Sequence, residues 1–129
     1  MSGKTRGKTV LVVEDEINVR IFASRVLEME GYNVLKTGNA EDGLGLLNQN
    51  NVALVLLDLR LSVFSRLWLL ETIKSTPKIS AIPVIILTDS AEASQRERAL
   101  GMGAVDYLVK PVGAGGIRKA VARVLRQNK

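Results

Sequence analysis

Val55-Leu56-Leu57-Asp58-Leu59 is an apolar run that carries one carboxylate. A run this short and this apolar predicts a strand buried on both faces, as in a parallel sheet covered by helices. Asp58 then has to lie at the rim of the sheet, because an unpaired ion deeper inside would cost several kcal/mol. In open parallel α/β sheets, ligands bind at the carboxyl ends of the strands. Asp58 is therefore the first candidate for a reactive residue.

The composition limits the kind of protein this is. The 129 residues suit one domain with a single core, and 47% hydrophobic with 24% charged residues is ordinary for a globular chain. Because cysteine and histidine are absent, disulfides, thiolate metal sites and a phosphohistidine on this chain are excluded. No apolar run reaches the length of a membrane span, and the N-terminus lacks a signal-peptide core. We expect a cytoplasmic location and no membrane contact.

The net charge is basic. Eighteen Lys and Arg residues against 13 Asp and Glu residues give a formal charge of +5. Such a balance can indicate nucleic-acid binding, but much of it lies within residues 4–8 and 118–129. Solvated termini and one solvated helix face are the simpler interpretation. Direct nucleic-acid binding is not expected, because no residues are left over to build a DNA-binding module.

Five apolar runs alternate with five segments of helical pattern. The predicted strands are 10–13, 33–36, 53–57, 83–87 and 105–109, and the predicted helices are 17–31, 40–48, 67–74, 91–100 and 117–126. This alternation predicts an α/β fold: a parallel sheet with helices on both faces and right-handed crossovers.

The first helix should place four apolar residues on one face and end at Gly31. These apolar residues are Val19, Phe22, Val26 and Leu27.

Glycines and capping residues predict local features of the other helices. Gly43 and Gly45 should weaken the second helix. Asp89 or Ser90 is expected to cap the fourth helix. Residues 113–116, Gly-Ala-Gly-Gly, are poor helix formers, so the connection into the last helix should be loose.

Chemically active side chains follow four of the predicted strands: Glu14 with Asp15, Asp58, Thr88 and Lys110. The ends of parallel strands share one rim, so we expect these groups to meet. Three converging carboxylates would repel one another, and both Mg²⁺ and the Lys110 ammonium would relieve that repulsion. A hard cation, a lysine and a hydroxyl suit a phosphoryl group, for which aspartate is a known nucleophile. The rim predicts phosphoryl transfer to or from a carboxylate.

Each of these residues also has a simpler interpretation. Asp15 could cap the first helix, Asp58 could cap a loop, Thr88 is a common strand residue, and Lys110-Pro111 could be a plain turn. Their coincidence at four strand ends favours one shared site.

Four segments carry a resemblance to a known family: VLVVEDE at 10–16, LLD at 56–58, PVIILT at 83–88 and GAVDYLVKP at 103–111. Over about residues 8–127 the chain resembles the receiver domain of two-component response regulators. The resemblance implies a flavodoxin-like, doubly wound, five-stranded parallel sheet with strand order 2-1-3-4-5. It also implies that 8–127 form the domain, 1–7 a disordered basic tail and 128–129 a second tail.

The resemblance implies a phosphoacceptor and a metal site. Asp58 resembles the acceptor, which takes a phosphoryl group from a histidine kinase or a His-phosphotransfer protein. Glu14 and Asp15 resemble the acidic pair that holds Mg²⁺ together with Asp58, and the backbone carbonyl of Arg60 resembles a further ligand. Such a protein is a signalling domain and not an enzyme in the usual sense, although it catalyses its own phosphorylation and dephosphorylation.

The resemblance also implies a switch. Thr88 resembles the hydroxyl that moves to the phosphoryl oxygen, and Lys110 its cationic partner. The Lys110-Pro111 bond is expected to be cis. Tyr107 resembles the aromatic residue that turns inward when Thr88 moves. The face made by the fourth helix, fifth strand and fifth helix would then be read by a downstream output protein or domain.

Three positions depart from the family pattern. Ser62 and Arg66 stand where proline and glycine are usual, and a side chain at 66 is expected to reshape the loop after Asp58. Asp89 stands where a small residue is usual, and its charge should slow phosphorylation by repulsion unless it points away. These departures leave open a degenerate receiver that works as an unphosphorylated protein-binding module.

Two further points concern residues after Asp58. An aspartyl-phosphate phosphatase of another α/β family would need an aspartate at position 60. Arg60 occupies that position, so this function is not expected. Phe64 and Trp68 are four residues apart and could share a face. They form either a local aromatic pair over the loop or an exposed apolar patch for a partner or a homodimer.

Overall fold

The computed structural model describes residues 7–58 and 67–127 and contains five strands and five helices within them. The strands are β1 (Thr9–Val13), β2 (Asn33–Thr37), β3 (Leu54–Asp58), β4 (Val84–Thr88) and β5 (Asp106–Val109). The helices are α1 (Ile17–Met29), α2 (Ala40–Gln49), α3 (Trp68–Ser75), α4 (Ala93–Gly101) and α5 (Ala114–Gln127). Strands and helices alternate in the predicted order. None of the described helices is both long and apolar enough to cross a bilayer.

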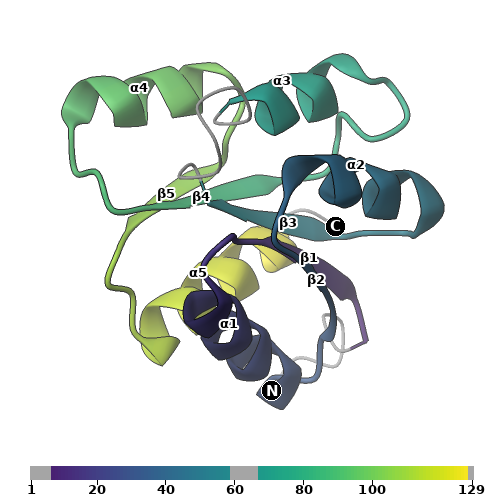
Figure 1. Ribbon diagram of the computed structural model, residues 1–129, viewed down its shortest axis with the longest axis vertical. Coiled ribbons are helices and arrows are strands. Elements are labelled where there is room, and N and C mark those ends of the chain that lie inside the picture. The colour runs from purple at the N-terminus through teal and green to yellow at the C-terminus, as the bar shows by residue number, and fades with distance from the viewer. Residues whose placement is uncertain (1–6, 59–66, 128–129) are drawn as a thin grey trace.

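The strands form one parallel sheet in the order β2-β1-β3-β4-β5. Helices α1 and α5 cover one face of it, and α2, α3 and α4 cover the other (Figure 1). The predicted doubly wound fold and its strand order are therefore confirmed. In this arrangement every strand ends at the same edge, which is where the chemically active residues were expected.

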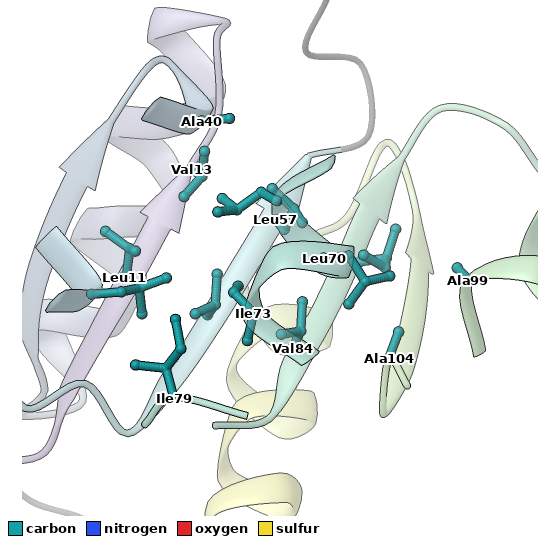
Figure 2. Packing of buried hydrophobic residues seen from close by; sticks show 14 of the residues in the cluster. Leu11, Val13, Ala40, Leu57, Leu70, Ile73, Ile79, Val84, Ala99 and Ala104 are labelled. Atoms are coloured by element: carbon teal, nitrogen blue, oxygen red, sulfur yellow. The ribbon is translucent and has the colours of Figure 1, made fainter. Parts of the chain in front are cut away.

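Alternate residues of the central strands enter two separate apolar clusters, one on each face. Leu11 and Leu57 point toward the cluster that includes Leu70 and Ile73 of α3 (Figure 2). Their sequence neighbours, such as Leu56, belong to the second cluster, with α1 and α5. The continuous apolar runs follow from this two-sided burial, because both faces of each central strand lie inside the protein.

The predicted buried face of α1 is only partly correct. Val26 and Leu27 are buried, whereas Phe22 is 44% exposed. Gly31 does terminate the helix, with a φ of 94° that residues with a side chain rarely adopt. Phe22 is only partly covered because its side chain borders an open cavity, which Ile117 of α5 also lines.

The predicted cap of α4 is wrong. The N-cap residue is Glu92, and its side chain makes no capping hydrogen bond. Ser90 lies two residues before this N-cap, where its Oγ accepts the Glu92 N–H at 3.3 Å. The helix therefore begins two residues later than expected.

The prediction of a loose start for α5 is also wrong. The helix begins at Ala114 and runs through both Gly115 and Gly116. Ile117 is 1% exposed, and its N–H donates to the Gly113 carbonyl at 3.2 Å. Burial of the Ile117 side chain compensates for the poor helix propensity of glycine.

Gly43 has a packing reason that the sequence did not reveal. A Cβ at this buried position would lie 3.2 Å from Val13 Cγ2 and 3.4 Å from Leu69 Cδ2. A Cβ on Gly45 would meet nothing within 4 Å. Gly43 lets α2 lie close to the sheet, while Asn39 caps the helix by accepting the Asp42 N–H at 2.8 Å.

Candidate functional site

The sheet brings four of the predicted site residues to one edge. Glu14 follows β1, Asp58 and Thr88 are the last residues of β3 and β4, and Lys110 follows β5. Glu14, Asp58 and Thr88 are each about 1% exposed. Burying two carboxylates this completely is costly unless cations or hydrogen bonds compensate. Buried carboxylates at the end of a strand, despite this cost, are typical of a functional site.

Three acidic side chains form a cluster at this edge. One carboxylate oxygen from each of Glu14, Asp15 and Asp58 lies within 4.8 Å of the others. Asp15 is exposed, so the cluster opens to solvent on its side. Carboxylate oxygens at this spacing fit a hard divalent cation such as Mg²⁺, which takes oxygen ligands and keeps several waters. The backbone carbonyl of Arg60, the fourth predicted ligand, lies outside the described residues.

Lys110 provides the positive charge. Its Nζ is 3.0 Å from Glu14 Oε1 and 3.5 Å from Asp58 Oδ1, with only 12% of its side chain exposed. The Lys110–Pro111 peptide bond is cis. The ammonium is therefore placed between the two buried carboxylates, where it offsets part of their repulsion.

The position of Glu14 depends on contacts that sequence reasoning missed. The Glu14 N–H donates to the Thr37 carbonyl at 3.0 Å, and Arg20 Nη1 donates to the Glu14 carbonyl at 2.9 Å. The Glu16 N–H donates to its Oε2 at 3.1 Å. Gly38 leaves room for the arginine, because a Cβ there would lie 2.7 Å from Arg20 Nη1. A glycine directly after the second strand was the one signal for this contact.

Thr88 and Tyr107 are joined through one loop residue. The Ser90 N–H donates to Thr88 Oγ1 at 3.2 Å, and the Tyr107 hydroxyl donates to the Ser90 carbonyl at 2.9 Å. Tyr107 is 7% exposed, and burial raises the pKa of its phenol. Gln95 Oε1 is also 2.9 Å from the hydroxyl, so an amide orientation that donates to the phenol oxygen satisfies both contacts. Gln95 was not predicted as part of the site.

A cavity of about 510 Å³ adjoins the site. Lys110, Asp89 and Glu16 line it together with apolar side chains that include Phe22 and Ile117. Asp89 is exposed and thus lies on the outer side of the strand edge, next to the cavity.

The loop that follows Asp58 carries the remaining predictions. Ser62, Phe64 and Arg66 lie outside the described residues. Trp68 begins α3 and is 37% exposed. An aromatic side chain is therefore accessible at the start of α3.

The fold and the acidic strand edge together define a flavodoxin-like α/β domain with a site suited to phosphate and a divalent cation. Comparison with known proteins gives the family. The model of the response regulator receiver domain matches residues 10–122. The chain belongs to this family, the receiver domains of two-component response regulators.

Curated relatives are similar over nearly the whole chain. The phosphate regulon transcriptional regulatory protein PhoB of Pseudomonas aeruginosa is 32% identical over 121 residues, which are 94% of this chain and 53% of the relative. The KDP operon transcriptional regulatory protein KdpE of Escherichia coli is 35% identical over 119 residues, 92% of this chain and 52% of the relative. The chain thus spans about half the length of the curated relatives it matches.

Solved structures agree with the fold. A CheY-like response regulator receiver domain protein from Methanospirillum hungatei has a TM-score of 0.85 and 27% identity, covering 95% of this chain and 96% of its own. A response regulator from Chloroflexus aurantiacus has a TM-score of 0.87 and 25% identity, covering 94% and 99%.

Proposed function

We propose that Asp58 accepts a phosphoryl group from a histidine kinase or a His-phosphotransfer protein, that Mg²⁺ is required, and that the chain then changes one face for a partner. The observation that supports this most directly is the pair of buried carboxylates, Glu14 and Asp58, held 3.0 and 3.5 Å from Lys110 Nζ. A structural ion pair would need only one acid. Here two buried acids share one lysine, which places an Asp58 oxygen beside a fixed cation.

The chain's own residues supply most of the chemistry. An Asp58 carboxylate oxygen attacks phosphorus, the bond from phosphorus to the donor atom breaks, and the electron pair leaves with the donor. Lys110 is placed to neutralise charge on the transferred group, and Thr88 offers a hydroxyl on the adjacent strand. Bound Mg²⁺, held by Glu14, Asp15 and Asp58, would supply charge stabilisation for the phosphoryl oxygens. The same residues would later catalyse hydrolysis of the acyl phosphate.

A change at Thr88 would reach Tyr107 through Ser90. Movement of the Thr88 hydroxyl toward a phosphoryl oxygen breaks its bond with the Ser90 N–H, and Ser90 also accepts the Tyr107 hydroxyl. The loop at Ser90, the Tyr107 ring and helix α4 are therefore coupled, because Tyr107 also contacts Gln95 of α4. This coupling supports a switch on the face made by α4, β5 and α5.

The outer side of α5 suggests the chemistry of the output partner. Arg118, Lys119 and Arg126 are exposed, and residues 114–127 include no acidic residue. This charge favours an output protein or domain with an acidic surface. The similar proteins PhoB and KdpE are transcriptional regulators, so we place the output in transcription, through another domain or protein and not through direct nucleic-acid binding.

Exposed apolar residues of α1 support a protein as the phosphoryl donor. Ile17, Ile21 and Phe22 are 57%, 39% and 44% exposed, and Phe22 lines the cavity next to Lys110. Exposed apolar side chains beside a reactive site are typical of a protein-docking surface. The proposed function places the chain in the cytoplasm, with its donor.

The decisive experiment is intact mass spectrometry after incubation with a small phosphodonor, with and without Mg²⁺. We expect a gain of one phosphoryl group that requires Mg²⁺ and is absent in Asp58→Asn. A folded protein that binds Mg²⁺ but gains no mass would instead support the unphosphorylated binding module, for which the Asp89 charge beside the site is the specific observation.

A further inference from the structure

We infer that Asp89 and Glu16 select the chemical class of phosphoryl donor: they favour donors with a protonated phosphorus–nitrogen bond over acyl phosphates. This inference rests on the proposed phosphorylation of Asp58 and adds a specificity device to it. It comes from the charges around the cavity beside Lys110, which neither the fold nor the acidic metal cluster requires.

The cavity is the open space next to the reactive lysine. Its lining includes Lys110, whose ammonium is 3.5 Å from Asp58 Oδ1. A donor that places its phosphoryl group on Lys110 therefore has its leaving group in or beside this cavity. Asp89 and Glu16 line the same cavity, and both are exposed.

These two acids come from different elements that border the cavity. Glu16 is the N-cap residue of α1, where its side chain makes no capping hydrogen bond. Asp89 directly follows Thr88 at the end of β4. Apolar residues such as Phe22 and Ile117 line the same cavity and reduce the local dielectric constant, so the effect of each charge extends further than it would in water.

Two donor classes differ in the charge of the leaving group. When acetyl phosphate transfers its phosphoryl group to Asp58, the phosphorus–oxygen bond breaks and the electron pair leaves on acetate, an anion. When phosphoramidate or a protonated phosphoimidazole reacts, the phosphorus–nitrogen bond breaks, the electron pair goes to a nitrogen that already carries its proton, and a neutral amine leaves.

Negative charge beside the leaving group therefore acts in opposite directions. Asp89 and Glu16 oppose the charge that develops on acetate, and they attract the positive charge that a protonated nitrogen retains in the transition state. Only interactions that differ in the transition state change the rate of the chemical step. The donor class favoured here is the phosphoramidate type, which includes a phosphorylated imidazole.

The test compares two small donors on one protein. Phosphorylation rates with acetyl phosphate and with phosphoramidate are measured by intact mass at saturating Mg²⁺ and constant ionic strength, for the unchanged chain, Asp89→Asn and Glu16→Gln. The control is Glu28→Gln, which removes one exposed negative charge at the far end of α1. Circular dichroism verifies folding of each variant.

We expect Asp89→Asn to raise the acetyl phosphate rate by about two- to fivefold without raising the phosphoramidate rate, so that the ratio of the rates changes. Glu16→Gln should act in the same direction, and Glu28→Gln should leave the ratio unchanged. The effect should shrink at high salt. Because Glu16 contacts Glu14 through its backbone N–H, its substitution preserves the Glu14 contact.

The two proposals fail in different ways. If both donors phosphorylate Asp58 and the ratio is the same in all four proteins, the selectivity inference is wrong and the proposed function stands. An equal rise with both donors would likewise overturn it, because that result reports only easier access. If neither donor phosphorylates any of the proteins, the proposed function is wrong, and the inference falls with it.

Discussion

Lys110 Nζ lies closer to Glu14 Oε1, at 3.0 Å, than to Asp58 Oδ1, at 3.5 Å. The lysine therefore neutralises the acidic cluster as a whole and is not reserved for Asp58. The same position makes its ammonium a competitor of any divalent cation held by the two acids, because like charges at this separation repel.

We expect Lys110→Met to slow phosphorylation while it strengthens Mg²⁺ binding. Loss of the competing charge should lower the Kd for Mg²⁺ at least about fivefold, equivalent to about 1 kcal/mol. Without Mg²⁺ the variant should be less stable than the unchanged chain, because two buried acids lose their cation, and Mg²⁺ should restore much of that loss. Titration calorimetry and thermal unfolding with and without Mg²⁺ measure both effects. Lys119→Met controls for net charge, and equal Mg²⁺ affinity in both variants would contradict the competition.

The two glycines of α2 should respond in opposite directions to a larger side chain. Gly45→Ala should stabilise the protein by about 0.5–1 kcal/mol, because open space surrounds that position and alanine favours helix. Gly43→Val should destabilise it by about 1–3 kcal/mol, because its Cβ is already 3.2 Å from Val13 Cγ2. Urea unfolding of both variants, with Gly45→Val as the matched control, measures the difference. A harmless Gly43→Val would show that α2 can move away from the sheet.

Ser24 in α1 should be more stable as alanine. It is fully buried, and its Oγ has no hydrogen-bond partner among the described residues. A buried hydroxyl without a partner carries a desolvation cost, so Ser24→Ala should stabilise the protein by about 0.5–2 kcal/mol. Ser94→Ala, on the exposed side of α4, measures the gain from helix propensity alone. A stability change no larger than that of the control would mean that the Ser24 hydroxyl is satisfied in solution.

Tyr107 should make stability fall at alkaline pH. Burial raises the pKa of its phenol above the ordinary value of 10.0, so the folded state holds this proton more tightly than the unfolded state does. As the pH rises through 10, the unfolded chain loses the proton first and unfolding becomes more favourable. Urea unfolding between pH 8 and about 11 should show a steeper decline in the unchanged chain than in Tyr107→Phe. Parallel curves for the two proteins would argue against a buried phenol.

Trp68 tests self-association. Its indole is 37% exposed at the start of α3, where an apolar patch would face a second copy. We expect Trp68→Glu to weaken any concentration-dependent dimer seen by sedimentation without unfolding the domain, because a charge at a desolvated interface is costly. Met29→Glu, at a position 84% exposed on α1, is the control. Unchanged oligomeric state and stability in Trp68→Glu would assign Trp68 to a local packing role.

Much of the fold could be predicted because its signals are local. Apolar runs such as Val55–Leu57 are continuous where both faces of a strand are buried, and helical periodicity separates them, so the order of elements follows from neighbouring residues. The edge at which Asp58, Thr88 and Lys110 would meet also followed, because parallel strands end on the same side. The strand order itself came from the family resemblance.

What the sequence could not decide depends on contacts between distant segments. The helical start of α5 at Gly115 and Gly116 depends on burial of Ile117, and burial overrode propensity there. Phe22 has the periodicity of a core residue, but its side chain borders an open cavity and is 44% exposed.

The geometry of the site was likewise decided by the tertiary structure. The sequence by itself determined which reactive groups this protein has and which edge of the sheet they share. Only the folded structure decided that Lys110 lies between Glu14 and Asp58, that Arg20 holds Glu14, and that Ser90 joins Thr88 to Tyr107. The physical reason is range: strand and helix preferences act over a few residues, whereas distances between charges depend on how strands far apart in the chain are packed.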